Sequence, residues 1–408
     1  MLKTIRLWYL YDFANSFASA VVLFYYPLIL LEKGASNAWV GVATSVSTIV
    51  LLFILPYLGT YADKTGKRFF LIKLGALGIV FSLVSLAYVL QKTESITTFT
   101  IILLSDLCIF FYVSFHTSYL FYASMLRQIT ETTNNVKVSG VGLGFGQLGN
   151  ILALGILGPV VASSVAFFGL QGKPLALFLG GVAFISFSVP FLLQKDKDKI
   201  QLQEKLNFSY KKFIQEVISN KKLFFFLIGC SLLANAVLTF QLYVSIYLKK
   251  VFSFSDQLTT FASITALIFA VIGGFFANTI THKLKDKQTT LQMAAILAAI
   301  CFGFCSLMPK IAPLIFASLA LSGFSYGLVF SLSRAVYSEI VPVDKQGQYF
   351  SIFIVFERAA SIIGPTVWIV TFFLLSSFGE GIKYRSSMFL LLGVCFLGLY
   401  FLKKSKHS

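Results

Sequence analysis

Charged residues are scarce in this sequence. Only 12% of its 408 residues are Asp, Glu, Lys or Arg, and 57% are hydrophobic. Soluble domains carry roughly 25% charged residues. This scarcity excludes an ordinary soluble protein, because water cannot be the solvent for most of the chain.

Cysteine is also rare, and motifs for cofactors are missing. The five cysteines all fall within hydrophobic runs, where neither a disulfide framework nor a zinc site has its usual loop spacing. The sequence has no nucleotide-phosphate loop, no metalloprotease helix motif and no paired-cysteine metal site. We therefore expect no cofactor, no metal ion and no direct drive by ATP.

Long uncharged hydrophobic runs fill most of the sequence, and most reach the ~20 residues needed to cross a bilayer. They cover residues 13–31, 34–62, 74–91, 107–126, 138–172, 174–194, 223–248, 257–281, 288–309, 311–333, 359–379 and 386–402. We interpret 138–172 as one long helix that runs into an outer loop. The runs predict an all-α polytopic membrane protein of about twelve transmembrane helices. The first run lacks a small-residue cleavage site, so we expect it to be retained as a helix.

One long polar segment divides the runs into six and six. We expect an N-terminal six-helix bundle over 1–194, a cytoplasmic linker over 195–222 and a C-terminal six-helix bundle over 223–408. Apolar residues in the linker repeat near helical spacing, with lysines between them. That pattern suits an amphipathic helix on an anionic leaflet, and a solvated linker equally well.

Basic residues sort to one side of the predicted helices. With the N-terminus in the cytoplasm, 22 Lys and Arg residues lie inside, 8 lie outside and 3 fall within helices. A net charge of +17 could suggest a protein that binds nucleic acid, but the sorting of the basic residues follows the positive-inside rule instead. We expect a bacterial inner or plasma membrane protein with both termini in the cytoplasm and no nucleic-acid partner.

The loop between the second and third runs carries a glycine and acid pattern, Gly59 to Asp63 to Gly66 to Arg68. Gly59 allows two helices to approach closely, and Gly66 permits a tight turn. Asp63 can lie against a helix N-terminus or a basic residue. Such a contact would latch one conformation. The alternative is an ordinary charged turn. The pattern resembles the loop signature of the major facilitator superfamily.

Three further stretches sharpen this resemblance to the vacuole-effluxer-like branch of the superfamily, whose members include amino-acid effluxers of fungal vacuoles. They are 8–16 in the first helix, 138–146 in the fifth, and 331–365 across the tenth and eleventh. The resemblance implies a monomeric, 6 + 6 pseudo-symmetric secondary transporter that works by alternating access. It also implies that the first, fourth, seventh and tenth helices surround a cavity, which would bring Asn15, His116, Asn235 and Tyr326 toward it.

Polar residues of the first helix share one face. Asp12, Asn15, Ser16 and Ser19 stand at i, i+3, i+4 and i+7. Asp12 is only about two turns from the cytoplasmic end, roughly 9 Å. It could therefore belong to an inner gate, contact substrate or carry a proton.

Charges within the tenth and eleventh helices need partners, because unpaired charges are costly in hydrocarbon. Pairing of Glu357 with Arg334 and of Asp12 with Arg358 is the obvious arrangement, although the partners could be exchanged. The group could be a structural ion-pair cluster or serve coupling or recognition.

Histidine and acid side chains of the fourth helix are further candidates for proton coupling. His116 is near mid-span, where an imidazole could relay protons or simply satisfy a neighbouring helix. Asp106 is on the same helix.

Two other classes of function fit the sequence less well. Gly323 to Gly327 matches the nucleophile-elbow pattern of a serine hydrolase, but Ser325 lies in an apolar helical run without the required strand and turn. Charges at the midplane argue against a lipid-handling or scaffold protein, because they fit a polar cargo or a coupling ion better than an acyl chain. We expect a transporter of a small polar metabolite, with an amino acid or related compound favoured and proton coupling as an added feature, and not an enzyme.

Overall fold

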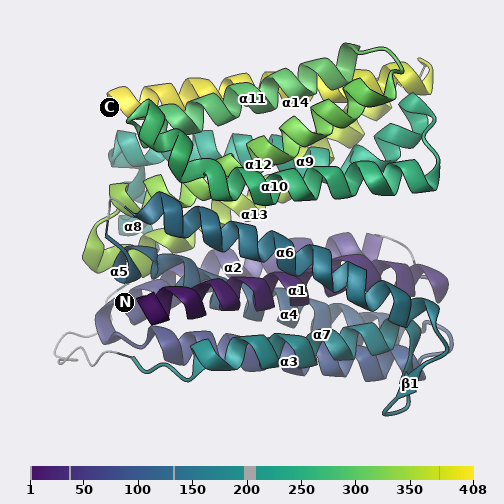
Figure 1. The fold of residues 1–408 in the computed structure, drawn as a ribbon. Coiled ribbons are helices and arrows are strands. Elements are labelled where there is room, and N and C mark those ends of the chain that lie inside the picture. The colour runs from purple at the N-terminus through teal and green to yellow at the C-terminus, as the bar shows by residue number, and fades with distance from the viewer. Residues whose placement is uncertain (1, 36–37, 132–133, 197–207, 376) are drawn as a thin grey trace. The chain divides into compact units, whose positions relative to one another are not determined.

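The computed structural model describes residues 2–35, 38–131, 134–196, 208–375 and 377–408. Its helices are α1 Leu2–Glu32, α2 Ala38–Thr65, α3 Arg68–Lys92, α4 Thr98–Ser124, α5 Leu126–Ile129, α6 Asn135–Ala162, α7 Gly172–Leu192, α8 Tyr210–Ser219, α9 Lys221–Phe252, α10 Asp256–Leu284, α11 Lys287–Leu307, α12 Ala312–Ile340, α13 Gln346–Leu374 and α14 Glu380–His407 (Figure 1). A 3-10 turn, η1 Val343–Lys345, precedes α13. Strands β1 Ala166–Phe167 and β2 Leu170–Gln171 form a small antiparallel hairpin after α6.

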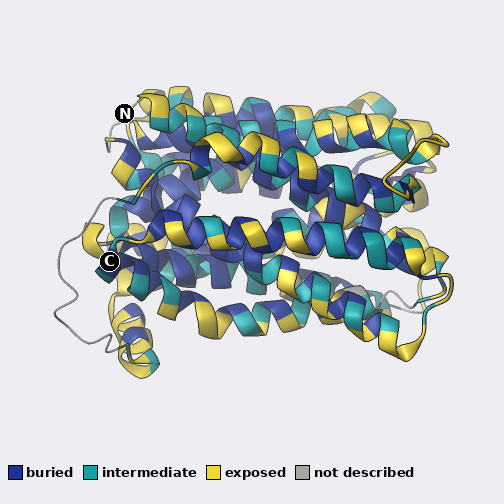
Figure 2. Ribbon diagram, turned by 90° about the horizontal axis from the view of Figure 1, so that it is seen from below, coloured by how far each residue is buried: buried dark blue, intermediate teal, exposed yellow. Residues whose placement is uncertain are grey.

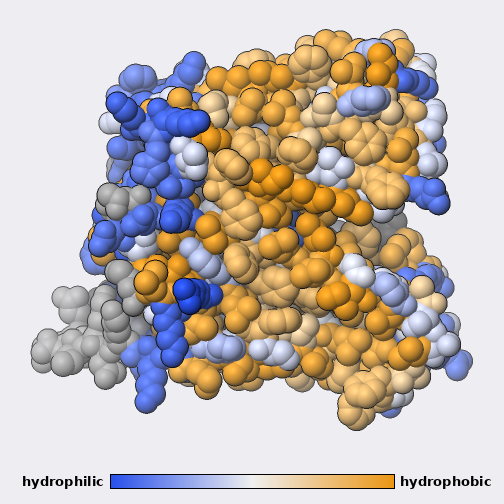
Figure 3. Space-filling view, viewed as in Figure 1, coloured by the Kyte–Doolittle hydropathy of each residue, from blue (hydrophilic) through white to orange (hydrophobic). Residues whose placement is uncertain are grey.

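Within these described residues, 12 helices are long and apolar enough to cross a membrane by length and composition. Large apolar side chains such as Phe81 and Phe304 are more than half exposed on their outer faces, as lipid contact requires. Figure 2 shows that buried and exposed residues occupy different faces of the long helices. On the face drawn in Figure 3, hydrophobic residues cover the middles of the helices and hydrophilic residues gather at their ends. The prediction of an all-α polytopic fold is confirmed.

Two helices differ from the predicted runs. The eleventh run begins at Ala359, yet α13 begins at Gln346, because Glu357 and Arg358 interrupt the uncharged pattern without interrupting the helix. The fifth run extends to Gly172, and α6 ends at Ala162 with the hairpin after it, in agreement with one long helix that runs into an outer loop. Hydropathy detects the apolar centre of a helix and misses polar turns that continue it.

The chain divides into two compact units by its contacts. Unit 1 contains residues 1–129, 145–208 and 343–354, and unit 2 contains 130–144, 209–342 and 355–408. The predicted boundaries at 194 and 223 follow the sequence halves, whereas each unit also takes a short segment from the other half. The 6 + 6 domain boundaries stay a prediction.

Unit 1 has an aromatic core at one end of its helices. The Trp8 ring stacks on Tyr122 with 4.2 Å between centroids, and the Tyr11 ring lies 4.9 Å from Phe191. Trp8 Nε1 donates to the Tyr122 carbonyl at 3.0 Å, and the Tyr11 hydroxyl bonds Ser118. These contacts join α1 to α4 and α7, and they give the Trp8 indole nitrogen and the Tyr11 hydroxyl their hydrogen-bond partners.

Unit 2 relies on close contacts between backbones. A Cβ on Gly323 would meet the backbone of Ala266, and a Cβ on Gly273 would meet the backbone of Phe324. Glycines therefore let α10 and α12 pack without side chains between them. Ser325 lies within α12 and donates to the Ala294 carbonyl of α11 at 2.7 Å. The Ser325 hydroxyl therefore bonds a neighbouring helix from within a continuous helix. A serine hydrolase needs its nucleophile at a sharp turn between a strand and a helix, and α12 has no such turn at Ser325.

Candidate functional site

Asp63 in the last turn of α2 is a densely bonded carboxylate of unit 1. Its oxygens accept from Arg68 Nη2 at 2.5 Å, from the Gly347 amide at 2.9 Å and from the Gln348 amide at 2.8 Å. The side chains of Asp63 and Arg68 are both 6% exposed. The two amides belong to the first turn of α13, where unpaired N–H groups and the helix dipole favour an anion. Asp63 thus meets both kinds of neighbour expected from the sequence, a basic residue and a helix N-terminus.

Glycines make this contact sterically attainable. A Cβ on Gly59 would lie 2.9 Å from the Gln348 Cα and closer still to the Gly347 backbone. A Cβ on Gly347 would lie 2.9 Å from Asp63 Oδ1. Gly66 has a φ of +75°, which suits the tight turn between α2 and α3. The role of Gly59, Asp63, Gly66 and Arg68 as a conformational latch stays a prediction.

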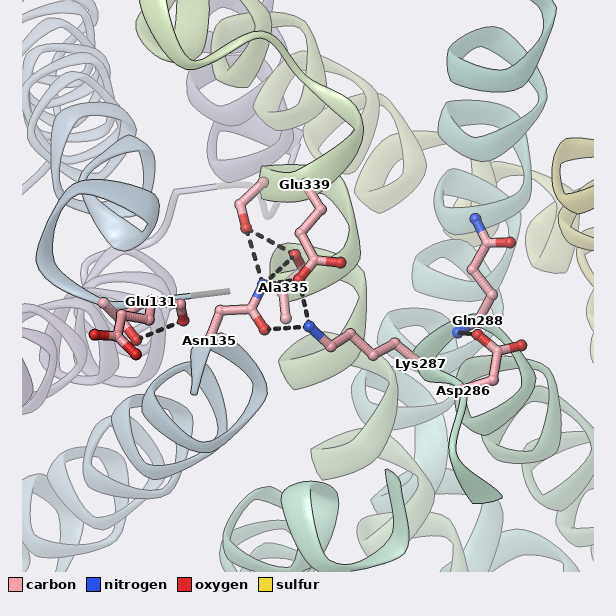
Figure 4. A network of polar contacts seen from close by, with 9 residues as sticks. Glu131, Asn135, Asp286, Lys287, Gln288, Ala335 and Glu339 are labelled. Carbon is pink, nitrogen blue, oxygen red and sulfur yellow. Dashed lines mark hydrogen bonds and ion pairs between the residues drawn. The ribbon is translucent and has the colours of Figure 1, made fainter. Parts of the chain in front are cut away.

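A second polar cluster, formed by Asn135, Lys287 and Glu339, lies in unit 2 (Figure 4). Asn135 begins α6, Lys287 begins α11, and Glu339 is in the last turn of α12. Asn135 Nδ2 donates to Glu339 Oε1 at 2.7 Å and to the Ala335 carbonyl at 3.0 Å. Lys287 Nζ donates to Asn135 Oδ1 at 2.9 Å and forms an ion pair with Glu339. The Asn135 amide therefore uses both its oxygen and its nitrogen to hold the ends of two other helices.

Sequence reasoning missed the Asn135, Lys287 and Glu339 cluster. Lys287 is one of the 22 basic residues on the cytoplasmic side, and no motif marks the other two. A usable signal is a repeat in the sequence, because Gly274 and Asn278 have the same four-residue spacing as Gly59 and Asp63. In the structure a Cβ on Gly274 would lie 2.8 Å from the Gly140 carbonyl oxygen, so α10 and α6 also meet through a glycine pair.

The buried arginine of α12 has a different partner from the one predicted. Arg334 Nε donates to Ser139 Oγ at 3.1 Å and Nη2 donates to the Ser139 carbonyl at 3.0 Å. Glu357 forms its ion pair with the adjacent Arg358, with 2.7 Å between Oε1 and Nη2. Glu357 thus has the partner of the exchanged arrangement, which the sequence left open, and not Arg334. The planar guanidinium of Arg334 matches two oxygens of one serine, and a flexible carboxylate can reach the next residue on its own helix.

Asp12 and its neighbours are buried in unit 1 against α6. Asp12 is 6% exposed and Asn15 is 2% exposed. A Cβ on Gly146 would lie 2.8 Å from Ser16 Oγ and 3.5 Å from the Asp12 carboxyl carbon, so this glycine makes room for the polar stripe. The predicted pairing of Asp12 with Arg358 stays a prediction.

The remaining candidates lie on separate helices. His116 is buried in α4 and packs against the Phe115 and Tyr112 rings. Asn235 on α9 donates to the Ala360 carbonyl of α13 at 3.1 Å, and Tyr326 on α12 is half-buried beside Phe330. Asn235 therefore ties two helices together. The parts of His116, Asn235 and Tyr326 in substrate binding stay predictions.

Asp106 differs from these buried groups. It is exposed on α4, in line with exposed Ile102 and Phe110 one turn away on either side. Its surroundings are those of an outer helix face, which makes it a useful contrast to buried Asp12.

Comparisons with known proteins point to one family. The sequence model of the Major Facilitator Superfamily matches residues 8–365. An uncharacterized MFS-type transporter, YxiO of Bacillus subtilis, is 26% identical over 392 residues, which cover 89% of this chain and 87% of that protein. Autophagy-related protein 22-1 of Aspergillus fumigatus is 21% identical over 267 residues, and this match spans only 43% of that protein.

Solved structures show the same fold at low identity. A bacterial homologue of the iron transporter ferroportin, in an outward-facing state, has a TM-score of 0.79 at 14% identity, with 99% of this chain and 100% of that chain covered. The proton:xylose symporter XylE has a TM-score of 0.72 at 13% identity, with 99% and 95% covered. The extent of the family match, together with the twelve spans, shows that the chain is a multi-pass membrane transporter, not an enzyme, and that it belongs to the Major Facilitator Superfamily.

Proposed function

We propose that this protein is a secondary active transporter that moves a small polar metabolite by alternating access, with an amino acid or a related compound as the preferred class and protons as the coupling ion. The observation that carries the proposal is the Asp63 contact. It joins the end of α2 to the start of α13, which come from opposite halves of the sequence. Hydrogen bonds and an ion pair hold it, and these can separate without disturbing an apolar core.

Buried and partly buried charges within the spans support a polar cargo. Asp12, Arg334 and the Glu357 and Arg358 pair all lie in helices that are otherwise apolar. Such groups are costly in a membrane and mark pathways for ions or polar substrates. A zwitterion has an ammonium that an acid can bind and a carboxylate that an arginine can bind, so acids and arginines together suit an amino acid.

The test is counterflow and uptake of a labelled metabolite panel, centred on amino acids, into proteoliposomes with and without a proton gradient. We expect one compound to accumulate only when the gradient is present. Asp12→Asn should remove the gradient-dependent part, because an amide cannot release a proton. Asp106→Asn is the matched control, because it removes an acid from the exposed face of α4 and should leave accumulation intact.

Two results would contradict the proposal. Absence of transport across the panel, with protein that is demonstrably folded, would argue for a lipid-handling or scaffold role. Full gradient dependence in Asp12→Asn, and in His116→Gln and Glu357→Gln, would remove these groups from proton coupling.

We also propose that the protein acts as a monomer without a cofactor, in a bacterial inner or plasma membrane with both termini in the cytoplasm. The 22 to 8 sorting of basic residues supports this orientation. Thiol labelling of a cysteine added at either terminus, in sealed cells and in inverted vesicles, tests it. Labelling from outside in sealed cells would overturn the orientation.

A further inference from the structure

Helix α8 is a short helix fixed directly to a membrane span. It covers Tyr210–Ser219, and α9 begins at Lys221. The one residue between them, Asn220, closes both helices. Its amide donates to the Glu216 carbonyl at 3.2 Å, and its side-chain oxygen accepts from the Leu223 amide at 3.1 Å. With no spacer, α8 must lie at the level where α9 enters the bilayer.

The apolar side of α8 is only half covered. Phe213 and Val217 are 2% and 5% exposed, and α8 packs on α9. Ile214 and Ile218, each one position further along the helix, are 48% and 53% exposed. One residue corresponds to about 100° of helix rotation, so the two isoleucines form a separate stripe beside the buried pair. An apolar stripe left open at the membrane surface suits lipid.

Lysines lie beside this open stripe and at the start of α9. Lys211 borders the stripe, about 20° beyond Ile218 on the helix projection, whereas Lys212 lies about 160° from Ile214. Lys221 and Lys222 are the exposed first residues of α9. The end of α14 adds a further cation, because Ser405 bonds the Lys222 carbonyl at 2.8 Å and Lys404 Nζ lies 4.3 Å from the Phe225 ring centre. These lysines, 211, 212, 221, 222 and 404, outnumber the one acid of α8, Glu216.

We propose that α8 is an interfacial helix that binds anionic phospholipid. Ile214 and Ile218 insert at the boundary between headgroups and acyl chains, and the bordering lysines bind the phosphate headgroups of the leaflet at which α9 begins. The amphipathic helix and the basic border provide two signals, one apolar and one electrostatic, which together give stable binding.

The test uses full-length protein in liposomes of phosphatidylcholine alone, or of phosphatidylcholine mixed with phosphatidylglycerol. Ile214→Cys is labelled with an environment-sensitive dye, and a quencher is placed on the lipids near the headgroup. The five native cysteines are buried, which makes the added thiol the accessible one. Ser219→Cys is the matched control, because it lies about 140° away from Ile214. We expect quenching at position 214 to exceed that at 219 by about threefold in the anionic bilayer.

The electrostatic part has its own readout. Replacement of lysines 211, 221 and 222 by Gln should lower quenching at position 214 about threefold in phosphatidylglycerol, and added salt should do the same. Equal quenching at 214 and 219, or at neither position, would overturn the proposal. So would equal quenching with and without phosphatidylglycerol, which would leave no role for the anion. Quenching at 214 that falls as the protein is concentrated would indicate a second copy on this face instead. None of these readings involves transport, so their failure is separate from failure of the proposed function.

Discussion

At the scale of the residue, the ionised Asp63 carboxylate depends on donors from another helix, α13. A buried carboxylate needs donors for its lone pairs, and Asp63 has a guanidinium and two backbone amides. Because the amides start α13, loss of that helix end would leave the Asp63 and Arg68 pair with fewer donors in a site nearly closed to water.

Asp63→Asn should therefore destabilise the protein. The amide leaves Arg68 buried without its counter-charge, and breaking a buried ion pair costs roughly 3 kcal/mol. Thermal unfolding of the purified protein, followed by circular dichroism, measures the effect. Lys67→Gln is the control, because Lys67 is exposed next to the same turn and should change little. Equal stability of Asp63→Asn and the wild type would show that the Asp63 and Arg68 ion pair does not contribute to the free energy of unfolding.

Gly59→Ala should open the α13 contact without changing any charge. The added methyl meets the backbone at Gly347 and Gln348, which cannot rotate away as a side chain can. We expect faster hydrogen exchange at the amides of 347 and 348, by about tenfold or more for each 1.4 kcal/mol lost. Gly41→Ala in the same helix has nothing within 4 Å of its new methyl and should leave exchange unchanged. Unchanged exchange in both variants would refute the close approach.

At the scale of the element, three helix ends meet through Asn135, Lys287 and Glu339. Each of these residues is at the first or last turn of its helix, where backbone groups lack partners within the helix. The Asn135 amide supplies a donor to the Ala335 carbonyl, and the Lys287 and Glu339 charges balance one another. The cluster therefore holds the starts of α6 and α11 against the end of α12 by directional polar contacts, in addition to apolar packing.

A double-mutant cycle tests whether these residues act as a unit. Asn135→Ala and Glu339→Gln both weaken the hold on Lys287, so their effects on the free energy of unfolding should not add. We expect a coupling energy of about 1 kcal/mol, measured from thermal unfolding of both single variants and the double variant. The cycle of Asn135→Ala with Lys283→Gln, an exposed lysine nearby in sequence, should be additive. Additivity in the first cycle would mean that the three contacts are independent.

The loop between α10 and α11 gives a prediction in pH. Partial burial raises the pKa of Asp286, but hydrogen bonds from Lys406, the Thr289 side chain and the amides of Gln288 and Thr289 outweigh burial and lower it from 3.8 to about 2. A lowered pKa stabilises the fold above the unfolded value and loses that effect as pH falls through the folded value. The stabilisation should thus be complete above pH 4 and disappear toward pH 2.

Asp286→Asn isolates this contribution. Both side chains of the Asp286 and Lys406 pair are 37% exposed, so solvent screening limits the difference in unfolding free energy to the order of 1 kcal/mol at neutral pH. The difference between wild type and variant should shrink as the pH of the unfolding experiment is lowered from 4 to 2. A difference that stayed constant over this interval would assign the effect to something other than ionised Asp286.

At the scale of the whole molecule, hydropathy predicted the spans because each is a local property of about twenty residues. It failed at α13, where Glu357 and Arg358 break the uncharged run inside a continuous helix. The contact of Asp63 with Arg68 was predictable because glycine, acid and arginine lie within ten residues, whereas the Gly347 and Gln348 amides lie 284 and 285 residues away. The Asn135 cluster was not, because Asn135 lies 152 residues from Lys287 and 204 from Glu339. Arg334 likewise bonds Ser139, 195 residues away, and no local pattern encodes that choice.

The shared residue between α8 and α9 has a mechanical consequence. A joint of one capping residue transmits rotation, since neither helix can turn without straining the hydrogen bonds of Asn220. Any change in the tilt of α9 would therefore move α8 within the headgroup layer. Headgroups that bind α8 would resist this movement. The lipid composition of the leaflet would then affect the rate at which α9 changes its tilt.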